Sequence, residues 1–187
     1  METEISKCVE KLLAGEILLY PTDTVWGVGC DATNEAAIER IYAIKQRSER
    51  KSMLILLDKA EKLPYYVKRM PLIAWDLLEQ ATRPTTFIYP EAQNLPARLV
   101  PLDGTIAIRI AKSTFCRKLI AALDRPLIST SANISGTPSP TAFDEISYDI
   151  REQVDYIVPR EYDDSTDCKP SRMIRFIDDY NFVVIRD

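Results

Sequence analysis

Short apolar runs of the strand type alternate along this chain with segments whose apolar residues recur at helical spacing. The runs at 16–20, 53–57 and 86–90 are mostly continuous, whereas 5–12 and 34–45 carry apolar residues three and four positions apart. Alternation of this kind predicts a β-sheet with helices packed on its faces. Several strands follow one another with no helix between them, so parallel and antiparallel pairs should mix. The pattern predicts an α/β fold with a mixed sheet of about seven strands.

Local signals mark where the expected elements begin and end. Gly15 should end the first helix, and Asn34 and Ser113 should cap the helices that follow them. Asp58 is expected to cap a short helix, and Pro71 suits the first turn of another. Further strands are expected at 105–111, 126–130, 155–159, 171–177 and 181–186.

The length of 187 residues, with no repeat or linker, predicts a single domain spanning 1–187. The N-terminus "METEISKCVE" is acidic and polar, unlike a secretion or organelle-targeting signal. No apolar run approaches the roughly 20 residues that cross a bilayer. The expected location is therefore the cytoplasm, with no membrane partner.

The chain has no histidine. This excludes a Ser-His-Asp triad, a Cys-His pair and a histidine that serves as general base or metal ligand. The four cysteines are scattered without a CxxC pair, so they are interpreted as reduced thiols rather than disulfides or a zinc site. The net charge of −4 argues against a broad phosphate-binding surface but permits a local basic pocket.

The stretch "YPTDTVWGVGCDA" at 20–32 is an unusual sequence to follow the expected strand 16–20. Pro21 stops the ladder, two threonines flank Asp23, and Gly27 and Gly29 follow. The G-x-G alone is a weak dinucleotide signal, because the pattern G-x-G-x-x-G is not completed. Close backbone packing is the competing explanation for the two glycines, whereas the polar residues around them favour a ligand-binding turn.

Three further features could bind an anionic ligand. A basic run from Lys45 to Lys51 could clamp phosphate, although cations at a helix end also complement the helix dipole. The stretch "STSANISGTPSP" at 129–140 offers hydroxyls and an amide, although the same residues are common in ordinary turns. In the strand 105–111, Arg109 shares a face with the small Ala107, which leaves room for a ligand.

These motifs, taken together and in this order, resemble the YrdC/TsaC family of L-threonylcarbamoyladenylate synthases. The similarity covers nearly the whole chain and rests on "YPTDTVWGVGCDA", "KQR", "TIAIR" and "STSANISG". The KxR and SxN signature of the family is met by Lys45, Arg47, Ser131 and Asn133. The resemblance implies a twisted mixed sheet with flanking helices, whose concave face holds the nucleotide and the amino acid.

The resemblance also implies a nucleotidyltransferase reaction. L-threonine, bicarbonate (or CO2) and ATP would give L-threonylcarbamoyl-AMP and pyrophosphate, with Mg²⁺ carried by ATP. A downstream tRNA threonylcarbamoyl transferase would pass the group to the adenosine beside the anticodon. The missing histidine is compatible with this chemistry, because a carbamate nucleophile is already anionic and the step needs alignment and charge neutralisation.

Site residues carry over from the family by position. The catalytic pair would be Lys45 and Arg47. The threonine contacts would be Thr24, Arg109 and Ser171. The ATP contacts would be Arg47, Lys51, Thr105, Ser131, Asn133, Ser139 and Arg186.

Three departures from the family pattern leave one alternative open, and the concave face that the resemblance implies leaves another. Arg83 stands where a glycine is usual, Leu56 where some members have a histidine, and 160–172 is acidic and poor in glycine. One alternative is a YciO-like paralogue, and the other is an RNA-binding module whose partner is RNA. The polar, aperiodic segment Asp163–Pro170 is expected to form a mobile lid next to Ser171.

Overall fold

A computed structural model of the chain describes residues 1–46, 53–165 and 168–187. The α-helices are α1 (Glu2–Leu13), α2 (Glu35–Ile44), α3 (Leu63–Tyr66), α4 (Ala74–Gln80), α5 (Thr114–Leu123) and α6 (Tyr148–Gln153). The strands are β1 (Leu18–Tyr20), β2 (Gly27–Gly29), β3 (Leu54–Leu57), β4 (Thr85–Tyr89), β5 (Ile106–Ile110), β6 (Leu127–Ser131), β7 (Tyr156–Ile157), β8 (Arg172–Phe176) and β9 (Phe182–Arg186). Short 3₁₀ turns lie at Ala60–Lys62, Ala97–Leu99, Phe143–Glu145 and Arg160–Tyr162.

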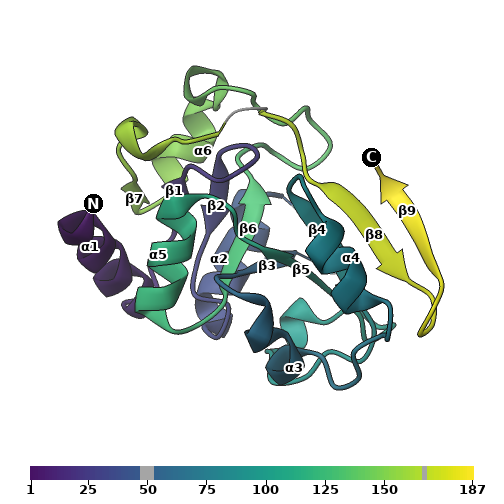
Figure 1. The fold of residues 1–187 in the computed structure, drawn as a ribbon. Coiled ribbons are helices and arrows are strands. Elements are labelled where there is room, and N and C mark those ends of the chain that lie inside the picture. Colours follow the sequence, from purple (N-terminus) through teal and green to yellow (C-terminus); the bar gives the residue numbers. More distant parts are fainter. Residues whose placement is uncertain (47–52, 166–167) are drawn as a thin grey trace.

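The strands form one mixed sheet in the order β7-β1-β2-β6-β3-β5-β4-β8-β9 (Figure 1). Both pair types occur, since β5 runs parallel to β3 and antiparallel to β4. The α/β class and the mixed sheet are therefore confirmed. The strand count was too low, because the described residues contain nine strands rather than about seven.

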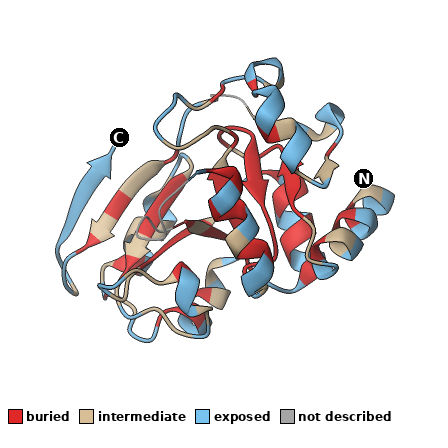
Figure 2. Cartoon of the chain, turned by 180° about the vertical axis from the view of Figure 1, so that it is seen from behind, coloured by how far each residue is buried: buried red, intermediate tan, exposed pale blue. Residues whose placement is uncertain are grey.

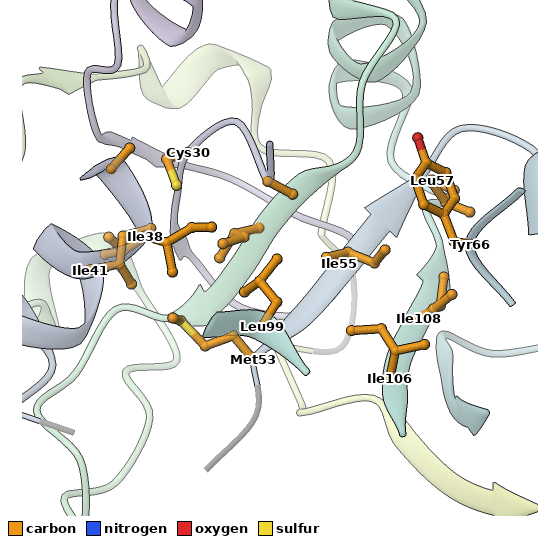
Figure 3. Packing of buried hydrophobic residues seen from close by; sticks show 14 of the residues in the cluster. Cys30, Ile38, Ile41, Met53, Ile55, Leu57, Tyr66, Leu99, Ile106 and Ile108 are labelled. Carbon is orange, nitrogen blue, oxygen red and sulfur yellow. The ribbon is translucent and has the colours of Figure 1, made fainter. Parts of the chain in front are cut away.

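Helices cover both faces of this sheet. On one face, α1 and α5 pack with Leu56 of β3 and Leu127 of β6 in a smaller apolar cluster. On the other face, residues of α2, α3 and α4 join a larger cluster. Figure 3 shows part of the larger cluster, in which Ile38 of α2 and Tyr66 of α3 lie around Ile55 of the central strand β3. No helix within the described ranges is long and apolar enough to cross a membrane.

The helix ends expected from the sequence are largely confirmed. Asn34 and Ser113 each accept a hydrogen bond from a backbone N–H three residues farther on, at the start of α2 and α5. Gly15 follows α1 with φ at +81°, a left-handed conformation that glycine adopts without a steric penalty.

Two expected helix starts are wrong. Asp58 caps no helix, because the turn Ala60–Lys62 begins after Lys59 and Asp58 instead pairs with Lys62 at 3.1 Å. Helix α4 begins at Ala74, three residues after Pro71, whose carbonyl accepts the Ala74 N–H at 3.0 Å. Pro71 therefore opens a separate turn rather than the helix.

Strand β2 was not expected, since its three residues include two glycines. It pairs with both β1 and β6, so the glycines sit inside the sheet. A Cβ at Gly29 would lie 2.0 Å from the carbonyl oxygen of Ile128 and 2.8 Å from the ring of Tyr20. Close backbone packing is therefore the correct explanation for Gly29.

Burial decreases from the centre of the sheet to its last strand. Figure 2 shows buried residues in the central strands and an exposed β9 at the edge. Strand β9 pairs with β8 alone in this sheet order, which leaves its outer side open to solvent.

Candidate functional site

A cavity of about 490 Å³ opens on one face of the sheet. Its floor is a row of neighbours in register across five strands, and such neighbours project from the same face. The row consists of Ser129, Leu54, Ala107, Ile88 and Arg175. The small Ala107 lies in the middle of the row.

Arg109 stands on the same face, two residues farther along β5. Its side chain is only 3% exposed, and Nη2 lies 3.1 Å from Oδ1 of the equally buried Asp23. Nη1 donates to the hydroxyl of Thr24 at 3.2 Å. The other oxygen of Asp23 accepts the backbone N–H of Lys112 at 3.2 Å. The carboxylate of Asp23 therefore offsets the charge of a buried guanidinium, which would otherwise be strongly destabilising.

Ser171 and Arg186 form another part of the wall. The hydroxyl oxygens of Ser171 and Thr86 lie 2.7 Å apart. Arg186 donates from Nε to the Ser171 carbonyl at 2.9 Å, and its Nη2 lies 3.5 Å from the Ser171 hydroxyl. Partial burial, and then the charge of Arg109, lowers the pKa of Arg186. An anionic ligand between the two guanidinium groups would relieve this repulsion.

Thr105, Ser131 and Ser139 add three hydroxyls to the lining of the cavity. Behind Ser131, the ammonium of Lys45 donates to the Ser131 carbonyl and to the Asn133 side chain, the latter at 3.1 Å. The Ser131 hydroxyl in turn donates to Asn133. Lys45 is 2% exposed, so it supports this turn from behind.

Cationic and hydroxyl side chains from separate parts of the chain thus line one cavity, and most of them belong to the motifs identified in the sequence. The chain also matches the family model Sua5/YciO/YrdC, described as telomere recombination, over residues 10–187. The chain belongs to the Sua5/YciO/YrdC family. The matched range includes every residue that lines the cavity.

Several relatives that align with most of this chain are named threonylcarbamoyl-AMP synthase. The threonylcarbamoyl-AMP synthase of Pseudoalteromonas translucida is 34% identical over 160 residues, which is 84% of this chain and 86% of the relative. The synthase of Vibrio cholerae is 32% identical over 157 residues, or 82% and 84% of the two chains.

Solved structures of the family have the same fold. Sua5 of P. abyssi in complex with L-threonine aligns with a TM-score of 0.86 at 28% identity, over 100% of this chain and 54% of that one. The chain thus spans about half of that Sua5. E. coli YciO aligns with a TM-score of 0.86 at 27% identity, over 100% and 90% of the two chains.

The structure brings most of the residues that the YrdC/TsaC resemblance predicts into the cavity. They are Thr24, Thr105, Arg109, Ser131, Ser139, Ser171 and Arg186. Lys45 and Asn133 do not line the cavity, because both lie behind Ser131. Arg47 and Lys51 lie outside the described residues. The roles of all these residues stay predictions.

Sequence reasoning missed several residues of the site. Asp103 accepts hydrogen bonds from the hydroxyl and the N–H of Thr105 and pairs with Arg175 at 2.7 Å. The Thr105 hydroxyl is the main cause that lowers the pKa of Asp103, and Arg175 adds to it. Thr86 lies on the same face of the sheet as its register neighbour Arg109 and is buried behind Ser171. Only the strand register identifies Thr86 and Arg175, and register is not visible in the sequence.

The start of the expected lid is held in place. Asp163 accepts a hydrogen bond of 2.7 Å from the indole of Trp26, and Asp164 accepts the N–H of Thr114 at 3.0 Å. These two bonds connect the start of the segment to the rest of the fold, and the mobile lid expected at Asp163–Pro170 stays a prediction. Residues 166–167 of that segment lie outside the described residues.

Proposed function

We propose that this chain is a threonylcarbamoyl-AMP synthase, a nucleotidyltransferase that joins L-threonine, bicarbonate and ATP and releases pyrophosphate. The observation that carries the proposal is the convergence of Thr24, Arg109 and Ser171 with Arg186 in one cavity. The curated relatives named for this activity, which align with most of the chain, support it.

The buried Arg109 is suited to bind the carboxylate of threonine. Asp23 fixes its guanidinium, so the arginine needs little reorganisation when a ligand arrives. Because Asp23 already neutralises Arg109, a bound carboxylate would gain from a second cation, and Arg186 provides one nearby. Thr24 and Ser171 would contact the remaining polar groups of the amino acid.

The reaction needs alignment more than proton transfer. The amine of threonine and bicarbonate give a carbamate and water. A carbamate oxygen then attacks the α-phosphorus of ATP, forming a new O–P bond as the bond to the leaving pyrophosphate breaks. The nucleophile is already anionic, so charge neutralisation by Arg186 and a hydrogen bond from Ser139 would supply what the step requires. The hydroxyl protons of Thr105 and Ser131 are directed to Asp103 and Asn133, so these two residues would accept hydrogen bonds from the nucleotide. Lys45 would act through the Ser131 turn that it supports.

Mg²⁺ enters this proposal as the ion carried by ATP. Over the described ranges, no group of three or more acidic or thiol side chains could hold a metal. Asp103, which lines the cavity, is already paired with Arg175 and Thr105. This donor set fits an ion that is bound mainly through phosphate oxygens and water.

A cytoplasmic location, a downstream tRNA threonylcarbamoyl transferase and contact with RNA complete the proposal as predictions. The net charge of −4 disfavours a broad RNA-binding surface. A YciO-like paralogue is the second candidate, because E. coli YciO has the same fold. The relatives named as synthases favour the first candidate over it.

The decisive experiment is mass-spectrometric detection of threonylcarbamoyl-AMP from the purified protein. Pyrophosphate release should require threonine, bicarbonate and ATP together, and omission of any one should abolish it. Arg186→Gln should slow product formation by about 10-fold or more, since one charge-assisted contact is lost. Arg117→Gln, an exposed site on α5, is the matched control and should not change it. ATP binding without product would favour the YciO-like alternative, and salt-sensitive RNA binding without product would favour the RNA-binding module.

A further inference from the structure

The hydroxyl of Thr22 uses its full hydrogen-bonding capacity within the turn after β1. It donates to the carbonyl oxygen of Val25 at 2.8 Å and accepts the backbone N–H of Thr24 at 3.1 Å. Its oxygen also lies 2.9 Å from the hydroxyl oxygen of Thr24. Thr22 is 1% exposed, so no water replaces these partners.

The direction of the Thr24 hydroxyl follows from a count of protons. A hydroxyl has one proton and two acceptor lone pairs. The Val25 carbonyl cannot donate, so the single proton of Thr22 lies on that contact. The proton between Thr22 and Thr24 must then belong to Thr24. Any other assignment would leave two oxygen atoms 2.8 Å apart in the buried turn with no proton between them.

Thr24 is therefore left with no proton for a ligand. One of its lone pairs faces Nη1 of Arg109 at 3.2 Å, and an arginine can only donate. Asp23 holds that arginine in place at 3.1 Å. Since Thr24 lines the cavity, its second lone pair is the group that remains for a ligand.

We propose that Thr22 is a positioning residue that turns Thr24 into a pure hydrogen-bond acceptor and thereby selects a ligand with an N–H or O–H donor at this point. The inference rests on the proposed function, because it takes the ligand to be an amino acid such as threonine. Two groups of threonine share this chemistry, the amine and the side-chain hydroxyl. A ligand that presents only an acceptor at this point meets a lone pair and is repelled.

The test is calorimetric titration of L-threonine into wild type, Thr22→Val and Thr22→Ser. Valine keeps the shape of threonine but frees the Thr24 proton, so the dissociation constant for L-threonine should rise by about 10-fold or more. Serine keeps the hydroxyl and should retain wild-type affinity. The affinity for ATP should stay unchanged in both variants, whereas a general structural defect would weaken both ligands.

L-2-aminobutyrate, which lacks the hydroxyl, identifies the donor. If Thr24 binds the amine, Thr22→Val weakens threonine and aminobutyrate by the same factor. If it binds the hydroxyl, aminobutyrate binds weakly to wild type and Thr22→Val weakens it no further. Both results support the proposal. If Thr22→Val binds L-threonine as tightly as wild type does, the proposal is wrong.

A second measurement needs no variant and covers the case in which Thr22→Val does not fold. Wild type is titrated with L-2-aminobutyrate and with (R)-3-hydroxybutyrate, which lacks the amine. If both bind as tightly as L-threonine, Thr24 selects no donor and the proposal is wrong. If wild type makes threonylcarbamoyl-AMP but binds both analogues as tightly as L-threonine, the role of Thr22 is refuted and the proposed function is not. Wild type that neither binds threonine nor makes the product refutes the proposed function, and the inference with it.

Discussion

The indole Nε1 of Trp26 donates a hydrogen bond of 2.7 Å to Asp163, which lies 137 residues farther along the chain. Trp26 is buried and packs edge-on against Phe143, with ring centroids 4.8 Å apart. The bond connects the turn that presents Thr24 to the segment that leads to Ser171. The bond thus joins two segments that are distant in sequence, each of which leads to a residue of the cavity wall.

Removal of this bond should destabilise the fold. Asp163→Ala removes the charged acceptor of the indole N–H, which should lower the free energy of unfolding by about 1–3 kcal/mol. Asp163→Asn keeps an acceptor oxygen and should cost clearly less. Urea unfolding followed by fluorescence measures both, and a Trp75→Phe background isolates the signal of Trp26. Equal losses in the two variants would show that the hydrogen bond is not the cause.

The Asp23–Arg109 pair should show strong energetic coupling. Asp23→Asn leaves an uncompensated buried guanidinium, which should cost about 3–5 kcal/mol of unfolding free energy. Arg109→Met should also be costly, because it isolates the carboxylate. The double variant should lose less than the sum of the two single losses. Unfolding curves for the four proteins give the coupling energy, and simple additivity would contradict a direct pair.

Thr86 should affect the use of threonine through Ser171. Thr86→Val removes the partner that lies 2.7 Å from the Ser171 hydroxyl, so KM for L-threonine should rise by about 5- to 30-fold, from a loss of roughly 1–2 kcal/mol. KM for ATP should change little. Thr85→Val is the matched control, because the Thr85 hydroxyl donates to the Arg83 carbonyl instead of pairing with Ser171. A rise in KM for threonine in both variants would indicate a general effect on β4.

The two glycines of β2 should differ sharply in their tolerance of a methyl group. Gly29→Ala would place Cβ 2.0 Å from a backbone oxygen, which the sheet cannot relieve without moving a strand, so a loss above about 3 kcal/mol is expected. At Gly27 the nearest atoms are side-chain atoms at 3.1 and 3.3 Å, and Gly27→Ala should cost clearly less. Thermal unfolding of the two variants measures this difference in stability. Similar melting temperatures would contradict the packing argument.

Acid should remove the contribution of Asp155 to stability. Burial alone would raise the pKa of Asp155, but hydrogen bonds from Arg40 and from the Ile17 N–H outweigh it, and the pKa is lowered. A lowered pKa in the folded state means that this stabilisation is present above the ordinary value near 3.9 and is lost as the pH falls through the lowered one.

Asp155→Asn should therefore cost about 1–3 kcal/mol at pH 7. The difference in unfolding free energy between wild type and Asp155→Asn should shrink as the pH falls from about 5 towards 2. Urea unfolding over this pH range measures it, with Glu10→Gln on the exposed side of α1 as control. A difference that stays constant to the lowest pH would exclude the charge of Asp155 as its source.

Much of the fold was predictable because apolar periodicity and capping are local properties. The helix caps at Asn34 and Ser113 and the strands around Ile55 and Ile108 follow from nearby residues alone. The missed strand β2, in contrast, depends on residues that are distant in sequence. Its two glycines give no strand signal, and only its pairing with β1 and β6 makes it a strand.

The candidate site was predictable in its motifs but not in its contacts. The sequence placed Thr24, Arg109 and Ser171 in one family pattern. It could not show that Thr86 lies against Ser171, because that contact joins residues 85 positions apart. Nor could it show that Lys45 points behind the cavity wall, since the direction of a side chain after a helix depends on what packs against it.

Arg186 lies on the outermost strand, whereas Thr24 lies in the turn after the first. During synthesis, Thr24 therefore leaves the ribosome early, and Arg186 follows more than 150 residues later. A nascent chain that has already paired Asp23 with Arg109 still has an open cavity with one cation fewer, until β9 docks onto β8. Substrate binding would thus wait until β9 pairs with β8, because only then does Arg186 reach the cavity.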